Sequence, residues 1–178
     1  MDADTLAKRI AAGEWVVDLR DRTAYATEHL AGSVGIALGQ QFATYLGWVI
    51  PWGTPLTLIG QDAAQVADAQ RQLVRIGIDR PAATGPVDVL AASTGTRAYP
   101  QRTFVDLARA LAEDADTVVL DVRRDDERAT GGIVGPTYVP LHSLLNRLDD
   151  VPPGSPLGAL RRRLPGQDRR QPAGPGRA

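Results

Sequence analysis

Few side chains in this sequence could carry out covalent or acid–base chemistry. The chain contains two histidines, His29 and His142, and no cysteine. The lack of cysteine excludes disulfides, thiolate metal sites and a thiol nucleophile at once. Because the histidines lack the H-x-H or H-x-x-x-H spacing that brings two imidazoles to one metal ion, we expect no zinc site and no cofactor.

His29 invites a catalytic interpretation, since histidine is the side chain that titrates near neutral pH. A lone histidine beside a turn is more often a structural hydrogen-bonding residue, and we favour that interpretation. The charged run from Arg123 to Arg128 is interpreted as a solvated loop. The sequence therefore predicts no catalytic, cofactor-binding or metal-binding residue.

One pattern occurs twice and indicates which elements position these residues. Each copy has an apolar run that ends in Asp-x-Arg, followed by a polar segment, a glycine and a second apolar run. Aligned without a gap, the copies pair Asp18 with Asp121, Arg20 with Arg123, Ala26 with Ala129, Thr27 with Thr130, Gly32 with Gly135 and Leu38 with Leu141. The pattern predicts a strand, a loop and a second strand in each copy.

This pattern resembles the rhodanese family, in which an apolar strand, Asp-Val-Arg, a Glu-aromatic pair, Gly-His-Ile and a strand ending in proline follow one another. The second copy keeps Asp121-Val122-Arg123, Glu127, Gly131 and Val139-Pro140, and the first copy keeps Tyr25 and His29-Leu30. Three residues depart from the family pattern: Ala24 replaces the glutamate, Arg128 the aromatic residue and Gly132 the histidine. The resemblance covers roughly residues 1–156.

The resemblance implies an α/β fold: a rhodanese-like parallel sheet flanked by helices, with one complete copy and a second, incomplete copy. Strands are expected at residues 15–19, 55–59 and 118–122. Helices are expected to begin at the capping residues Asp4, Asp62 and Thr103, the last with Asp106, and a short helix is expected at Leu144. The apolar run from Phe42 to Trp52 predicts a buried amphipathic helix that is stopped by Pro51. Residues 79–100 are rich in Gly, Pro, Ala and Thr and are interpreted as an interdomain connection. The predicted domains are residues 1–97, a rhodanese-like domain with an inactive loop, residues 98–156, a partial second domain, and residues 157–178, a disordered tail.

The resemblance also implies where catalysis would take place. In an active rhodanese the strand that corresponds to residues 55–59 ends in the cysteine of a Cys-x-x-x-x-Arg loop, whose backbone N–H groups hold a persulfide anion. Gly60 occupies the cysteine position in this chain, and Gln61 and Asp62 follow it. Since a carboxylate at Asp62 would repel the anion, we expect the loop of the first copy to be inert.

The tail replaces the central strand, cysteine loop and helix that the second copy needs. It has six arginines and no β-branched residue. One allowed back-translation of residues 157–176, moved by one base, encodes Trp-Val-His-Cys-Ala-Ala-Gly-Tyr-Arg-Ala-Lys-Ile-Ala-Ala-Ser-Leu-Leu-Asp-Arg-Ala, and its cysteine falls across Leu160 and Arg161. This shifted-frame segment contains a strand end, a Cys-x-x-x-x-Arg loop and an amphipathic helix. We hypothesise that the tail is out-of-frame translation and that the ancestral second copy was an active sulfurtransferase domain.

Tandem rhodanese copies with an inert first loop resemble the C-terminal part of bacterial metallo-β-lactamase-fold proteins of the persulfide dioxygenase type. In those proteins a metal-binding domain comes first, and the sequence supplies no His/Asp ligands for such a domain. Met1 lies almost at the edge of the first copy. We therefore expect a chain cut short at its N-terminus, without the ancestral metallo-β-lactamase-fold domain.

Composition narrows the remaining function classes. A net charge of −1 and a pI near 6.1 give no whole-chain argument for nucleic acid or anionic membranes. No apolar stretch approaches the ~20 residues of a membrane span, and the start of the chain is acidic where a secretion signal would be basic. We expect a cytoplasmic protein without membrane contact.

The sequence therefore predicts a rhodanese-like protein, related to thiosulfate sulfurtransferases, that is catalytically inactive because it has no cysteine. Two alternatives stay open. One is a non-catalytic binding or scaffold module for an unknown protein partner in sulfur metabolism. The other is a contact between the arginine-rich tail and nucleic acid, which the balanced charge of the rest of the chain disfavours.

Overall fold

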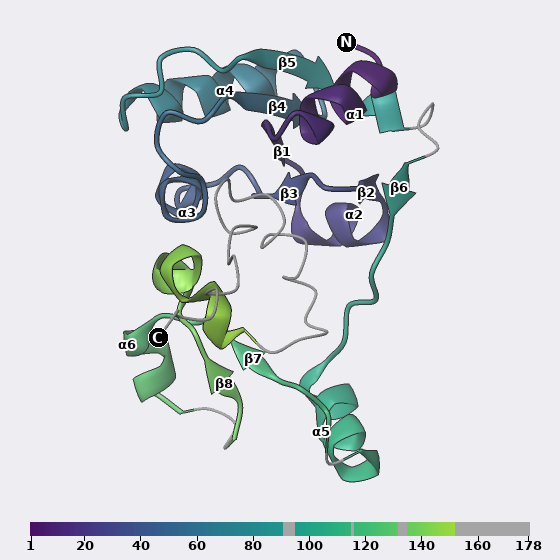
Figure 1. Cartoon of the computed structure of the whole chain (residues 1–178), viewed down its shortest axis with the longest axis vertical. Helices are drawn as coiled ribbons and strands as arrows, with labels where there is room; N and C mark the ends of the chain where they lie inside the picture. Colours follow the sequence, from purple (N-terminus) through teal and green to yellow (C-terminus); the bar gives the residue numbers. More distant parts are fainter. Residues whose placement is uncertain (91–94, 115, 132–134, 152–178) are drawn as a thin grey trace, which may run out of the picture.

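A four-stranded parallel sheet lies at the centre of the first copy (Figure 1). The computed structural model describes residues 1–90, 95–114, 116–131 and 135–151. The strand order is β3-β1-β4-β5, with bounds Val34–Gly35, Trp15–Asp18, Leu56–Gly60 and Ala83–Pro86. Every residue of β1 and β4 is buried. These strands form near-continuous apolar runs because a parallel sheet is covered on both faces.

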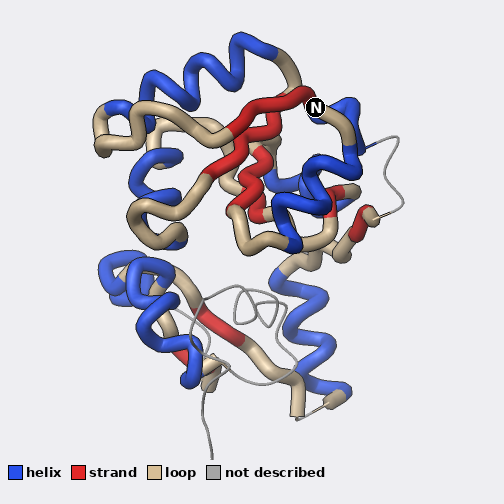
Figure 2. The backbone as a smooth tube through the Cα atoms, turned by 45° about the horizontal axis from the view of Figure 1, so that its top comes forward, coloured by secondary structure: helices blue, strands red, loops and turns tan. Residues whose placement is uncertain are grey.

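Helices cover both faces of this sheet, as Figure 2 shows. On one face, α1 (Ala3–Ala11) and the short 3-10 helix η1 (Val87–Leu90) enclose a cluster of Leu6, Val16, Leu30, Ile59 and Leu90. On the other face, α3 (Phe42–Val49) and α4 (Ala63–Val74) enclose a larger cluster that includes Trp15, Val17, Phe42, Leu58 and Leu73. The predicted fold class, a parallel sheet flanked by helices, is confirmed.

Side-chain caps set the beginnings of these helices. Helix α1 is capped by Asp2, whose carboxylate accepts a hydrogen bond from the Thr5 N–H at 2.8 Å, and not by Asp4 as the sequence predicted. Asp62 caps α4 by accepting from the Gln65 N–H at 2.7 Å. Each cap satisfies a backbone donor that has no partner within the helix.

Residues 83–90 belong to the first copy, so their interpretation as an interdomain connection was wrong. Strand β5 pairs with β4 along its whole length, and Leu90 is buried in the core. Pro86 ends this strand, which lies at the sheet edge, where a missing N–H costs no ladder hydrogen bond. Further on, β6 (Thr96–Arg97) pairs with β2 (His29–Leu30), which follows α2 (Arg22–Thr27).

The second copy forms a two-stranded parallel sheet in the part of the chain that the structure describes. Its elements are α5 (Phe104–Glu113), β7 (Leu120–Asp121), α6 (Asp125–Ala129), β8 (Thr137–Tyr138) and the 3-10 segment η2 (Leu141–Asp150). The predicted cap of α5 is confirmed, since Thr103 and Asp106 form a reciprocal capping box. Residues 152–178, and with them the predicted tail, lie outside the described residues.

Two predictions outside the sheet need correction. The charged run predicted as a loop contains helix α6, which begins where the Glu127 carboxylate accepts from the Arg124 N–H at 2.9 Å. The helix predicted to be stopped by Pro51 ends at Val49, but Trp52, which the prediction counted in the buried apolar run, has a side chain that is 73% exposed. Among the described residues, no helix combines the length and apolarity that crossing a membrane requires.

Equivalent amides in the two copies should differ in their rates of hydrogen exchange. The Leu38 N–H donates to the Leu19 carbonyl at 3.0 Å, and the Leu141 N–H donates to the Val122 carbonyl at the same distance; both leucines are partly buried. We expect the Leu38 amide to exchange at least about tenfold more slowly, because its sheet has four paired strands and the described sheet of the second copy has two. Site-resolved exchange by NMR measures the ratio. Equal protection would contradict an incomplete second copy.

Candidate functional site

The loop that joins β4 to α4 is the candidate site, because the resemblance places a catalytic cysteine at its first position. The Gln61 N–H donates to the side-chain oxygen Oε1 of Gln65 at 2.8 Å. The carboxylate of Asp62 accepts from the Gln65 N–H at 2.7 Å. These two N–H groups, which could otherwise point to an anion at a helix N-terminus, are therefore occupied by side chains of the same loop.

Space at Gly60 is also filled. A Cβ atom added to Gly60 would lie 2.9 Å from Gln65 Oε1 and 3.0 Å from Val66 Cγ2, so these two side chains would have to shift to admit it. The Gln65 amide is held from its other end as well, since its Nε2 donates to the Leu19 carbonyl at 3.3 Å. The Gln65 side chain thus closes the space beside Gly60 in which a thiol would have to stand.

A buried ion pair lies at the carboxyl end of β1, next to β4 in the sheet. The Arg20 guanidinium donates to both carboxylate oxygens of Asp18, with the Nη2–Oδ2 distance at 2.7 Å. Arg20 also donates to the Glu28 carbonyl at 2.6 Å, and its own N–H donates to Asp18 Oδ1 at 3.0 Å. Because Asp18 is fully buried and its two oxygens accept these bonds, the pair ties the strand end to the turn after α2.

The second copy contains the same ion pair in a more exposed setting. Arg123 donates to both oxygens of Asp121 and to the Gly131 carbonyl, and the Arg123 side chain is 40% exposed. Hydrogen bonds from Arg123 hold the pKa of the Asp121 carboxyl below its ordinary value, and the same bond raises the pKa of Arg123. Because the pKa of this carboxyl is lower in the folded state than in the unfolded state, the ionised carboxylate stabilises the fold at pH values above the ordinary carboxyl pKa. This stabilisation is lost as the pH falls through the folded-state pKa.

The two histidines lie in different surroundings. His29 Nδ1 lies 2.8 Å from the Tyr25 carbonyl oxygen, which can only accept, so Nδ1 carries the proton. Its ring stacks on Tyr25, with the ring centroids 4.2 Å apart. The His142 ring lies edge-on to Trp48, at 5.6 Å between centroids. Within the described ranges no group of three or more His, Asp or Glu side chains is placed to hold a metal ion.

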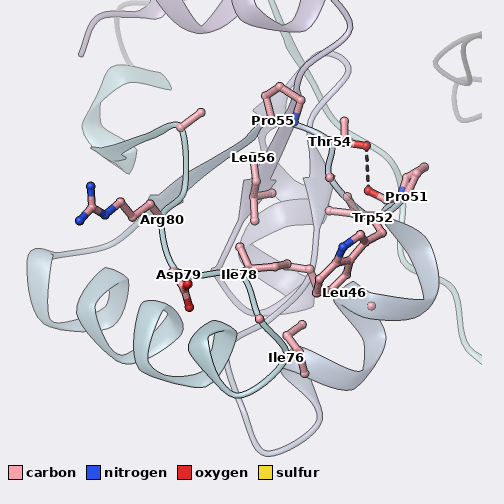
Figure 3. A pocket seen from close by; sticks show the side chains of 15 residues that line it. Leu46, Pro51, Trp52, Thr54, Pro55, Leu56, Ile76, Ile78, Asp79 and Arg80 are labelled. Atoms are coloured by element: carbon pink, nitrogen blue, oxygen red, sulfur yellow. Dashed lines mark hydrogen bonds between the residues drawn. The ribbon is translucent and has the colours of Figure 1, made fainter.

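A pocket of about 430 Å³ lies at the amino end of β4, at the opposite end of that strand from Gly60. Figure 3 shows the side chains of Leu46, Trp52 and Ile78 facing one another across it, while Arg80 extends away. The sequence did not indicate this pocket, because the apolar run from Phe42 to Trp52 predicts core packing. The pocket forms where the turn after Pro51 meets the residues that follow α4, which are distant in the chain.

Comparisons with known proteins support the fold. No protein-family model and no curated protein matches this sequence. Among solved structures, the Alr3790 protein from Anabaena sp. is 19% identical, with a TM-score of 0.50, and the match covers 60% of this chain and 99% of that one. Another structure from the same protein is described as its rhodanese-like domain.

Two further similarities are lower in TM-score. Thiosulfate sulfurtransferase from Pseudomonas aeruginosa is 19% identical over 77% of this chain and 30% of that one, with a TM-score of 0.45. A metallo-beta-lactamase from Staphylococcus aureus is 30% identical over 41% of this chain and 21% of that one, with a TM-score of 0.39. The assignment of the fold rests on the Anabaena structure and on the sheet described above. The chain has the rhodanese-like fold that the sequence predicts.

Proposed function

We propose that this chain is a tandem rhodanese-like protein in which the first copy is a non-catalytic module and the second derives from a sulfurtransferase domain. Matching hydrogen bonds support the tandem arrangement. The Asp18 carbonyl accepts from the Ile36 N–H at 3.0 Å, and the Asp121 carbonyl accepts from the Val139 N–H at the same distance. Val139 follows Ile36 at the same sequence distance at which Asp121 follows Asp18.

Side-chain and strand pairing repeat at the same offset. Strand β1 pairs with β3 through Val17 and Val34, and β7 pairs with β8 through Leu120 and Thr137. Each copy also links its arginine to a carbonyl eight positions beyond it, at Glu28 and Gly131 respectively. The agreement of the register, the ion pair and the arginine–carbonyl bond supports a common origin of the two strand–loop–strand segments.

The two copies contact each other through equivalent elements. Helix α3 follows β3 in the first copy, and η2 follows β8 in the second. These elements pack together, so that Leu144 and Leu148 join the core cluster of Phe42 and Leu46. Figure 1 shows η2 directly beside α3. An interface between matching elements is the arrangement expected of two related domains in one chain.

The filled loop at Gly60 carries the proposal that the first copy does not catalyse sulfur transfer. A persulfide anion needs a thiolate and free convergent N–H donors. In this loop the Gln61 and Gln65 donors are occupied, a side chain at Gly60 would displace Gln65 and Val66, and Asp62 adds a negative charge. These features disfavour the anion by sterics, by hydrogen bonding and by charge together.

Adding a thiol at Gly60 should not create activity. We expect a Gly60→Cys variant to form no persulfide adduct of about 32 Da, the mass of one sulfur atom, on incubation with thiosulfate. Its turnover of thiosulfate and cyanide should equal that of a Gly39→Cys control, because nothing lies within 4 Å of a Cβ at Gly39 and its thiol is unassisted. Mass spectrometry and a thiocyanate assay measure both. Turnover well above the control would contradict the inert loop.

A binding module for an unidentified protein partner is the second candidate. The observation that favours it is the apolar pocket at the amino end of β4, with Trp52 exposed at its side. Large exposed aromatic side chains beside a concave apolar surface are frequent at protein interfaces. The third hypothesis, contact of the tail with nucleic acid, concerns residues 157–178 and has no support from the described part of the chain.

A further inference from the structure

In the part of the chain that the structure describes, one edge of β7 has no paired strand and one face of α5 is less buried than the corresponding face of α1. Val118, just before β7, is 54% exposed, whereas every residue of β1 is buried. Helix α5 has no buried residue, whereas α1 buries Ala3 and Leu6. Figure 1 shows α5 beyond the two strands of the second copy, at the end of an extended stretch from β6.

The first copy shows what belongs on the open edge of β7. There, β1 pairs with β3 on one side and with β4 on the other, and Val16 lies opposite Thr57. Strand β8 occupies the place of β3 beside β7. Among the described residues, no strand occupies the position of β4 and β7 pairs with β8 alone, so its other edge presents backbone groups to which a parallel strand could be added.

The apolar face of α5 lacks its counterpart for the same reason. Counted from the capping residues Asp2 and Thr103, Leu107 corresponds to Leu6 and Leu111 to Ile10. Leu6 is fully buried against Ile59 of β4 and Leu90 of η1, and Ile10 packs on the same cluster. Leu107 and Leu111 are only partly buried. A strand in the β4 position would supply the side chains that these two leucines lack.

We propose that the free edge of β7 and the Leu107–Leu111 face of α5 form an acceptor site for a strand–loop–helix segment equivalent to β4–α4, bound in trans. The inference rests on the proposed tandem arrangement. The chemistry of the occupant follows from β4, a five-residue strand that is buried throughout and runs directly into a capped helix. The occupant is therefore an apolar strand of one polypeptide, parallel to β7, followed by an amphipathic helix.

A second copy of this chain does not fit these requirements. Its own β4 is paired on both sides and fully buried, so it is not available to another molecule. A segment with the required order of elements is the shifted-frame segment of residues 157–176, in which an apolar strand end precedes a loop and an amphipathic helix. A synthetic peptide of that sequence is therefore the probe for the acceptor site.

Binding of this peptide to the full chain tests the proposal. We expect saturable binding in fluorescence anisotropy and at least about tenfold slower exchange of the Val118 and Val122 amides when the peptide is bound, because their first-copy counterparts Trp15 and Leu19 donate to the Pro55 and Ile59 carbonyls on the β4 side. Val118→Asp should weaken binding by at least about tenfold, because it places a charge on the acceptor edge. Val74→Asp is the matched control: Val74 is 53% exposed on α4 and lies outside the acceptor site, so its binding should be unchanged. A peptide with proline in place of its strand valine should also bind weakly, since proline cannot donate to the ladder.

Three results would overturn the acceptor site. They are the absence of saturable binding, equal weakening by Val118→Asp and Val74→Asp, and protection of β7 that rises with protein concentration alone, which would make a second copy the occupant. The test of the acceptor site and the test of the proposed function can be told apart, because peptide binding is measured in the absence of thiosulfate.

If the peptide binds but no sulfur transfer is detected, the acceptor site is supported and the proposed sulfurtransferase ancestry is weakened. Turnover by a frame-restored protein, together with no binding in trans, overturns the acceptor site alone.

Discussion

A protein with its reading frame restored after Pro156 should transfer sulfur from thiosulfate to cyanide. The shifted-frame segment supplies a cysteine, the four residues after it and an arginine, which is the Cys-x-x-x-x-Arg loop that the rhodanese resemblance requires. Its place in the chain follows η2, as β4 follows α3 in the first copy. The restored thiol would lie at a helix N-terminus with no side chain equivalent to Asp62 in the loop, so its pKa should fall and its thiolate should persist.

The expected effect is large, because a nucleophile is gained where the present chain has none. We expect turnover at least about a thousandfold above that of the same restored protein with serine in place of the cysteine. Thiocyanate formation measures turnover, and a persulfide adduct in the mass spectrum identifies the intermediate. A silent restored protein with a normal folded spectrum would refute the proposed ancestry of the second copy, and it would leave the inert loop of the first copy unaffected.

The central strands could be predicted from the sequence because burial there is complete. A run such as Trp15–Asp18 or Leu56–Gly60 is short and apolar at nearly every position, which is the composition expected of a strand covered on both faces. The caps at Asp62 and Thr103 were equally visible, since the side chain and the N–H that it accepts from are three residues apart. Local chemistry decides such features, so local sequence reveals them.

Features that depend on contacts between residues far apart in the chain could not be predicted from the sequence. Strand β5 has the composition of a loop, and it is a strand because β4 offers it an edge. Trp52 belongs by composition to the apolar run before it, yet Pro51 turns the chain and leaves the indole exposed. In both cases tertiary context overrode the local pattern.

The candidate site was predicted in part. The absence of a thiol and the carboxylate at Asp62 were evident from the sequence. The closure of the loop by Gln65 was not, because it depends on a side-chain amide that reaches back to the Gln61 N–H and across to the Leu19 carbonyl. Likewise, the sequence did not reveal that Arg128, which departs from the family pattern, lies over the Tyr138 ring, with its guanidinium carbon 4.3 Å from the ring centroid.

The two ion pairs should differ sharply in their effect on stability, although their hydrogen bonds are nearly the same. Replacing Asp18 with alanine leaves Arg20, whose side chain is 11% exposed, without its carboxylate inside the protein. Removing one partner of a buried pair typically costs about 3–5 kcal/mol, because the remaining charge is desolvated without compensation. We therefore expect Asp18→Ala to lower the free energy of unfolding by about that amount, which is a large share of the stability of a small domain.

Asp121→Ala is the matched variant in the second copy, and its loss should be far smaller. Arg123 is 40% exposed, so water can solvate the guanidinium once the carboxylate is gone. Urea unfolding followed by circular dichroism measures both losses, and the exchange rates of the Leu38 and Leu141 amides assign each loss to its copy. High salt should change the Asp121→Ala result more than the Asp18→Ala result, because screening acts on exposed charges. Equal losses would mean that burial does not set the contribution of these pairs, and that the second copy is as tightly closed around Asp121 as the first is around Asp18.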